Sequence, residues 1–123
     1  MHYLKQISKI NQAWNYHKMI HLLLQTSTDS LSIAKIISKK IIDSNLSPCV
    51  HIINSPTTIY KWEGNSITTK EYIIQIKTVE SLKNDIIKSI KKDHNYKNPE
   101  LISQVINIES KEYKLWFNKE LNL

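Results

Sequence analysis

The sequence predicts one domain of the α+β class, in which an antiparallel sheet carries two helices on one face. Three observations lead to this prediction: a long hairpin occupies the centre of the chain, a helical pattern lies on each side of it, and a strand-like run flanks each helix. At 123 residues, the chain can bury one core and is too short for two ordinary domains. We assign residues 1–16 to an N-terminal extension and residues 17–123 to the domain.

Two runs rich in β-branched and aromatic residues, 49–60 and 72–78, form the arms of the predicted hairpin. Gly64 is the only glycine and stands between them, where a tight turn needs a positive φ that glycine adopts without a Cβ clash. Pro56 predicts a bulge or break in the first arm, because proline donates no ladder hydrogen bond. Polar and apolar residues alternate weakly in the second arm, so we expect the second sheet face to meet other subunits.

The segments before and after the hairpin each predict a strand and a helix. An apolar run within residues 17–26 precedes a cluster of Thr, Ser and Asp, which ends a strand and supplies helix-capping oxygens. Apolar residues at helical spacing predict helices over about 30–44 and 81–92. A strand over 101–108 and a short helix over 110–121 complete the chain. This order of elements is the split βαβ, or ferredoxin-like, arrangement.

The composition argues against several classes of protein. The net charge is +6, but all 17 basic residues are lysines, so the planar fork that arginine offers to phosphates and guanine is absent. No apolar run approaches the roughly 20 residues that cross a bilayer, and the first residues lack the apolar stretch of a signal peptide. We therefore expect a cytoplasmic protein that binds no nucleic acid and does not span a membrane.

Five short stretches follow one another in a fixed order over about residues 18–120. They read PCVHI from Pro48, YKWEG from Tyr60, IKT from Ile76, HNYKNPEL from His94 and EYKLW from Glu112. Together they resemble the CutA family of divalent-cation tolerance proteins. The resemblance implies a ferredoxin-like subunit in a tight homotrimer, akin in shape to PII signalling proteins, with a link to copper and other divalent cations.

Enzymatic activity is not expected. The resemblance does not imply one, and the sequence has neither a nucleophile elbow nor a glycine-rich loop that could cradle a phosphate.

This sequence departs from the family at positions that bear on metal binding. Some members have a proposed copper set made of a cysteine late in the first strand and a His-His pair before the motif tyrosine. Here these positions hold Gln25 and Asp93-His94. Only His94 remains of that set, with Asp93 as a harder oxygen ligand. Next to them, Asn95 replaces a proline, which we expect to make the turn less rigid.

Cys49 is the one soft ligand in the sequence. It would favour Cu(I) if a second sulfur or an imidazole joined it, but a cysteine in a buried strand usually behaves as a small hydrophobic residue. We expect His51 to point to the opposite face of the same strand, so that the two residues would not chelate one ion. His94 and Glu100 flank a turn that follows a helix, so a carboxylate is also at hand there. The candidate metal ligands are His94, Asp93, Cys49 and Glu100.

The resemblance also places four residues in a cleft between neighbouring subunits: Trp62, Glu71, Lys77 and Tyr96. A histidine and carboxylates can bind a divalent cation there, whereas a lysine would repel the ion or neutralise the carboxylates in a structural network. A small anion or metabolite is a third occupant.

The large aromatic residues are expected to anchor the trimer, because such residues are enriched in protein interfaces. The candidates are Tyr60, Trp62 and Trp116. Two hypotheses remain open from the sequence. One is a protein that binds or responds to metal ions, and the other is a PII-like trimeric signalling or interaction module whose clefts hold a partner protein or a small polar ligand.

Overall fold

The computed structural model describes residues 19–123, and the extension expected over residues 1–16 lies outside them. The order of elements agrees with the prediction. The elements are β1 (His21–Thr28), α2 (Leu31–Asp43), β2 (Cys49–Trp62), β3 (Asn65–Val79), a 3-10 turn (Glu80–Leu82), α3 (Lys83–Asp93), β4 (Ile102–Ile106) and α4 (Lys111–Glu120). No helix within these residues is long and apolar enough to cross a membrane.

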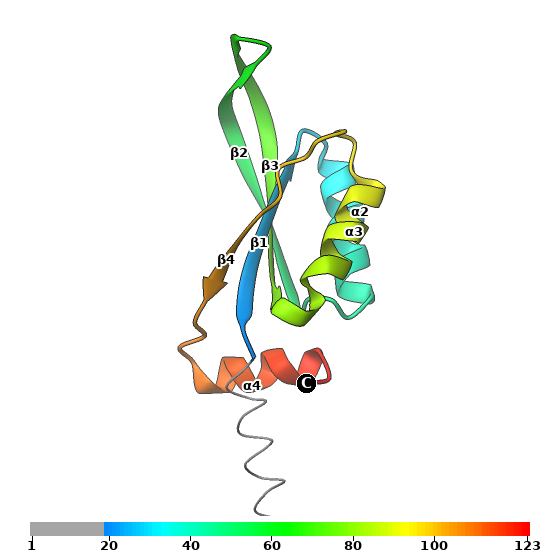
Figure 1. Ribbon diagram of the computed structural model, residues 1–123, viewed down its shortest axis with the longest axis vertical. Coiled ribbons are helices and arrows are strands. Elements are labelled where there is room, and N and C mark those ends of the chain that lie inside the picture. Colours follow the sequence, from blue (N-terminus) through cyan, green and yellow to red (C-terminus); the bar gives the residue numbers. More distant parts are fainter. Residues whose placement is uncertain (1–18) are drawn as a thin grey trace, which may run out of the picture.

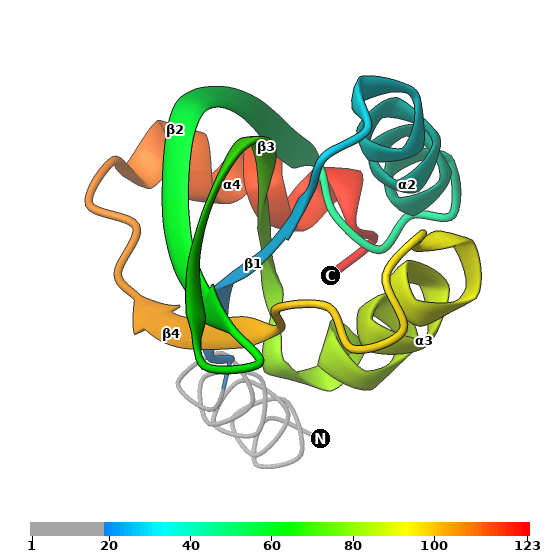
Figure 2. The ribbon, with the colours of Figure 1, turned by 90° about the horizontal axis from the view of Figure 1, so that it is seen from above.

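The four strands form one antiparallel sheet in the order β2-β3-β1-β4. Helices α2 and α3 lie side by side on one face of it, and α4 crosses the end of the sheet that is farthest from the hairpin tip (Figures 1 and 2). This arrangement confirms the α+β, ferredoxin-like prediction. We call the sheet face that α2 and α3 do not cover the open face.

The hairpin of β2 and β3 turns where the sequence places its single glycine. Gly64 has a φ of 81°, and Glu63 before it also has a positive φ, of 48°. The ladder between the arms is interrupted between Ser55 and Thr58, around Pro56, which confirms the predicted bulge. The second arm begins at Asn65, seven residues earlier than expected, so the outer half of the hairpin projects beyond the rest of the subunit (Figure 1).

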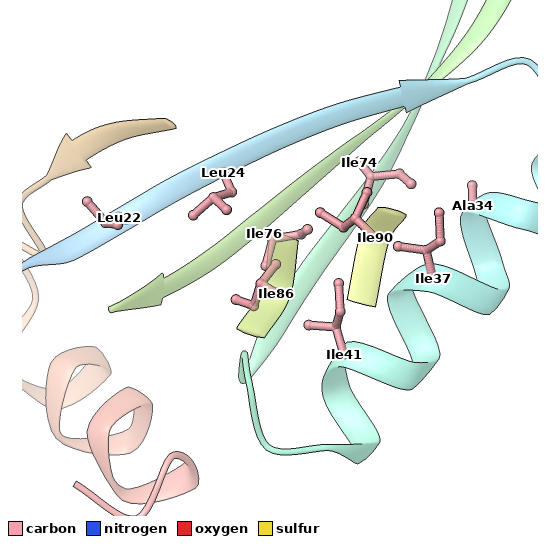
Figure 3. Packing of buried hydrophobic residues seen from close by; sticks show 9 residues of the cluster. All are labelled: Leu22, Leu24, Ala34, Ile37, Ile41, Ile74, Ile76, Ile86 and Ile90. Atoms are coloured by element: carbon pink, nitrogen blue, oxygen red, sulfur yellow. The ribbon is translucent and has the colours of Figure 1, made fainter. Parts of the chain in front are cut away.

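The main core lies between the sheet and the two helices on its covered face (Figure 3). Isoleucines dominate it, and their branched side chains pack between the strands and the apolar stripes of the helices. Its buried members are Leu22, Leu24, Ala34, Ile37, Ile41, Ile74, Ile76, Ile86 and Ile90. Because this cluster closes most of the covered face, the open face and the edges of the sheet remain for further contacts.

A second, smaller cluster holds α4 against the sheet. Phe117 of α4 and Leu121, which caps the end of this helix, pack on Val79. Beside them, the buried His21 ring places Nε2 at 3.0 Å from the side-chain oxygen of Asn118. These contacts fix α4 over only one end of the open face, and the rest of that face stays uncovered within the subunit.

Candidate functional site

Two of the predicted cleft residues meet where the loop after α3 passes the end of β1. The Tyr96 hydroxyl lies 3.1 Å from each carboxylate oxygen of Glu71 and donates to them. The Thr69 hydroxyl donates to the same carboxylate at 3.3 Å. The Glu71 residue is only 4% exposed. Within residues 19–123, no ion pair joins Glu71 to a lysine. The carboxylate is therefore buried, and among the described residues it is held by hydroxyl groups alone.

The environment keeps the Tyr96 hydroxyl protonated. Burial raises the pKa of this hydroxyl, and so do its hydrogen bond to Glu71 and the negative charge of that carboxylate. A phenol with a raised pKa keeps its proton at neutral pH and remains a donor. Tyr96 and Glu71 thus form a stable donor and acceptor pair.

His94 holds this loop in place through both nitrogens of its ring. Its Nδ1 accepts a hydrogen bond from the backbone N–H of Tyr96 at 2.9 Å. Its Nε2 lies 2.9 Å from the carbonyl oxygen of Ser27, which can only accept, so Nε2 carries the proton. Burial lowers the pKa of His94, which favours this neutral form. To ligate a metal ion, His94 would have to give up one of the two bonds.

Asn95 fastens the same turn to the end of β1. Its side-chain oxygen accepts from the Thr28 hydroxyl at 2.6 Å, and its amide nitrogen donates to Asp29 at 2.8 Å. The expectation of a less rigid turn considered only the lost proline ring. Two side-chain hydrogen bonds now supply a different constraint, and sequence reasoning did not foresee them.

The four candidate metal ligands do not gather in the subunit. The Asp93 carboxylate accepts from the Lys40 ammonium of α2 at 3.0 Å. Glu100 is exposed, and Cys49 begins β2 at the opposite end of the sheet from the loop of His94. Among residues 19–123, no three His, Cys, Asp or Glu side chains come close enough to hold a metal ion together. Their role as ligands stays a prediction.

The remaining cleft and interface residues lie apart from Glu71 within the subunit. The Lys77 ammonium is 3.5 Å from the Tyr113 hydroxyl and lies over the ring of that residue. Trp62 stands at the hairpin tip with 57% of its surface exposed, and Tyr60 and Trp116 are also exposed. Their surfaces are thus available for contacts between subunits, and those contacts stay a prediction.

Cys49 and His51 lie on the same face of β2, and the expectation that His51 points away from Cys49 is wrong. Alternate residues of a strand share a face, so a spacing of two brings their side chains together. The Cys49 sulfur is 3.9 Å from Nε2 of His51. Cys49 is a free thiol of intermediate exposure, so it is not fully buried either.

Comparison with known proteins agrees with the fold and with the five stretches. Residues 22–120 match the family model described as CutA1 divalent ion tolerance protein. The divalent-cation tolerance protein CutA of Thermus thermophilus is 28% identical over 90 residues, which cover 73% of this chain and 87% of that protein. The rice protein named Protein CutA 1, chloroplastic, is 34% identical over 82 residues, which cover 67% of this chain but only 46% of the rice protein.

Solved structures show the same architecture. The crystal structure of CutA from Xylella fastidiosa aligns with a TM-score of 0.77 at 30% identity, and the alignment covers 82% of this chain and 97% of that one. The match in sequence therefore extends to the course of the backbone over nearly the whole domain. Fold, motifs and family model lead to one conclusion: the chain belongs to the CutA1 divalent ion tolerance protein family.

Proposed function

We propose that this member of the family works in the cytoplasm as a homotrimer without enzymatic activity, and that it binds copper or another divalent cation in a cleft between subunits. The names of its relatives refer to tolerance of divalent cations.

The observation that supports a cation site is the buried carboxylate of Glu71. Buried charges in proteins are paired or coordinate metal ions, since an isolated charge loses its hydration without compensation. Hydroxyl groups from Tyr96 and Thr69 satisfy part of the hydrogen-bonding capacity of this carboxylate but bring no positive charge. A divalent cation entering from the cleft would supply that charge.

Calorimetry of the metal-free protein with Cu(II) and Zn(II) tests the proposal. We expect saturable binding, weakened by at least about tenfold in Glu71→Gln because a charged ligand is lost. Glu109→Gln is the matched control, since Glu109 is exposed and lies in the loop between β4 and α4. Absence of saturable heat with either ion, or equal affinity in the two variants, would contradict the metal site.

The homotrimer is supported by the surfaces that the subunit leaves uncovered. The outer half of the hairpin projects alone, and Ile59 and Trp62 on it are mostly exposed. Ile102 and Val105 of the edge strand β4 are exposed as well. Neighbouring copies could cover both the hairpin and the open face. Light scattering at micromolar concentration should give three times 14.4 kDa, and a monomer would exclude the assembly.

A second candidate function is the PII-like module, in which the clefts hold a partner protein or a small polar ligand. It is favoured by the lack of any three-ligand group within residues 19–123. In this reading, a lysine of a neighbouring copy neutralises Glu71. A thermal-shift screen of metabolites, run beside the metal titrations, separates the two candidates: stabilisation by a metabolite alone favours the module.

A further inference from the structure

The pair formed by Cys49 and His51 lies outside the cleft and has the geometry of a site for one metal ion. Metal–thiolate bonds of about 2.3 Å and metal–imidazole bonds of about 2.0 Å allow the two ligand atoms to be at most about 4.3 Å apart, and a tetrahedral angle brings them to about 3.5 Å. The separation of 3.9 Å between sulfur and Nε2 lies between these limits. One ion fits between the atoms with an angle wider than tetrahedral.

Both ligand atoms are available for binding. Cys49 is a free thiol, and His51 is exposed. In the part of the chain that the structure describes, the contact with sulfur is the only hydrogen bond of the His51 ring. This contrasts with His94, where both ring nitrogens are engaged with the backbone. No existing bond of the imidazole to another partner must be broken when a metal ion enters between Cys49 and His51.

The donor set selects the kind of ion. Thiolate is a soft ligand that favours Cu(I) or Zn(II), but protein zinc sites nearly always use three or four protein ligands. Cu(I) is a soft ion of low charge that is stable with only two such ligands. Within residues 19–123, no third histidine, cysteine or carboxylate joins the pair. The number of ligands therefore favours Cu(I).

The local charge favours the same ion. Lys77 lies directly opposite Cys49 in the register of β2 and β3, and Gln75 lies opposite His51. A thiolate and Cu(I) together are neutral. A thiolate and a divalent ion together keep one positive charge, which the nearby ammonium of Lys77 would repel. Neither cross-strand neighbour is a carboxylate that could offset that charge.

We propose that Cys49 and His51 form a copper(I) site on the open face, separate from the divalent site around Glu71. The thiol releases its proton on binding, and the neutral imidazole ligates through Nε2. The proposal does not depend on a metal ion in the cleft, because no residue is shared between the two sites.

The test uses the full-length, reduced protein under anaerobic conditions, with Cu(I) supplied as its bicinchoninate complex. Competition for the ion gives stoichiometry and affinity, and X-ray absorption gives the ligand atoms. We expect one Cu(I) per chain bound by one sulfur and one nitrogen from the protein. Cys49→Ser and His51→Gln should each weaken binding by at least about tenfold, since each removes a ligand.

Two further variants keep the result specific. Asn54→Gln is the matched control on the same strand, because Asn54 is exposed and on the opposite face, and it should bind as wild type does. His51→Cys supplies a second soft ligand at the same position and should restore binding. Equal affinity in His51→Gln and wild type, or no uptake by wild type, would overturn the proposal. If the Cu(II) titrations of wild type and Glu71→Gln gave no evidence for a cleft site, the result of the Cu(I) assay would still stand.

Discussion

Two regions of the subunit place a histidine beside another functional side chain and use the imidazole in opposite ways. At the loop after α3, His94 bonds the backbone on both sides of the ring, and Tyr96 and Glu71 complete a closed network. On the open face, the sulfur of Cys49 is the only hydrogen-bonding partner that residues 19–123 offer to the His51 ring. A histidine can therefore ligate an ion only where a nitrogen lone pair is available, whether or not it belongs to a motif.

The network around His94 and the open face should also differ in what they contribute to stability and to assembly. The closed network is satisfied within one subunit, so damage to it should destabilise the subunit itself. The open face and the hairpin have few partners within the subunit, so damage there should act on contacts between copies or with ions.

Trp62→Ala should produce the largest effect, and it should fall on assembly. A large aromatic side chain at the hairpin tip is an expected anchor, and its truncation at an interface hot spot costs about 2–4 kcal/mol. Sedimentation over a concentration series measures the loss of trimer. An unchanged oligomer with an unchanged melting temperature would place the anchor elsewhere.

Tyr96→Phe should act on the subunit. It removes the donor shared by both oxygens of the buried Glu71 carboxylate, and a hydrogen bond to a charged group is worth about 1.5–3 kcal/mol. Chemical denaturation of this variant measures the free energy of unfolding. The exposed Tyr60 provides the control as Tyr60→Phe, which should change that free energy little. Equal losses in the two variants would mean that the network does not stabilise the subunit.

Gly64→Ala should destabilise the hairpin turn moderately. No atom lies within 4 Å of a Cβ built at this position, so the effect comes from the positive φ of 81° alone. The left-handed conformation costs a residue with Cβ about 1–2 kcal/mol. Thermal unfolding gives the size of the loss. A neutral substitution would show that the projecting hairpin contributes nothing to the measured unfolding.

The titration of His94 should give the smallest effect, and this effect appears in the pH dependence of stability. Because burial lowers its pKa in the folded protein, the unfolded chain binds the proton more readily. The contribution of neutral His94 to the free energy of unfolding is complete above the pKa of about 6.5 that this residue has in the unfolded chain. It is lost as the pH falls through that value towards the lower pKa in the folded protein. Wild type should therefore lose stability below about pH 6.5 more steeply than His94→Gln. Parallel curves in denaturant titrations from pH 5 to 8 would contradict this.

Much of the fold could be predicted because local patterns dictate it. Gly64 and Pro56 each have a backbone property that no other residue shares, and they mark the turn and the bulge. Ile37 and Ile41 repeat at helical spacing and are fully buried. The full length of the hairpin was not evident, because Asn65 to Lys70 is largely polar and reads as a loop without the pairing strand.

The site was harder to predict, because it depends on contacts between distant residues. Asp93 follows from the motif as an oxygen ligand, yet it pairs with Lys40 of another helix. His94 matches the family position, but only the structure reveals that both its nitrogens are bonded. The pairing of Cys49 with His51 was within reach of the sequence, since residues two apart on a strand share a face.

Nitrogen-15 NMR of the histidine rings during titration with Cu(I) tests whether His51, and not His94, is free to bind the ion. Before copper is added, the spectrum should show His94 with its proton on Nε2 and Nδ1 accepting a hydrogen bond. On addition of Cu(I), the Nε2 signal of His51 should shift strongly while both His94 signals stay in place. A shift of the His94 ring with His51 unchanged would contradict the account and assign the copper ligand to the loop after α3.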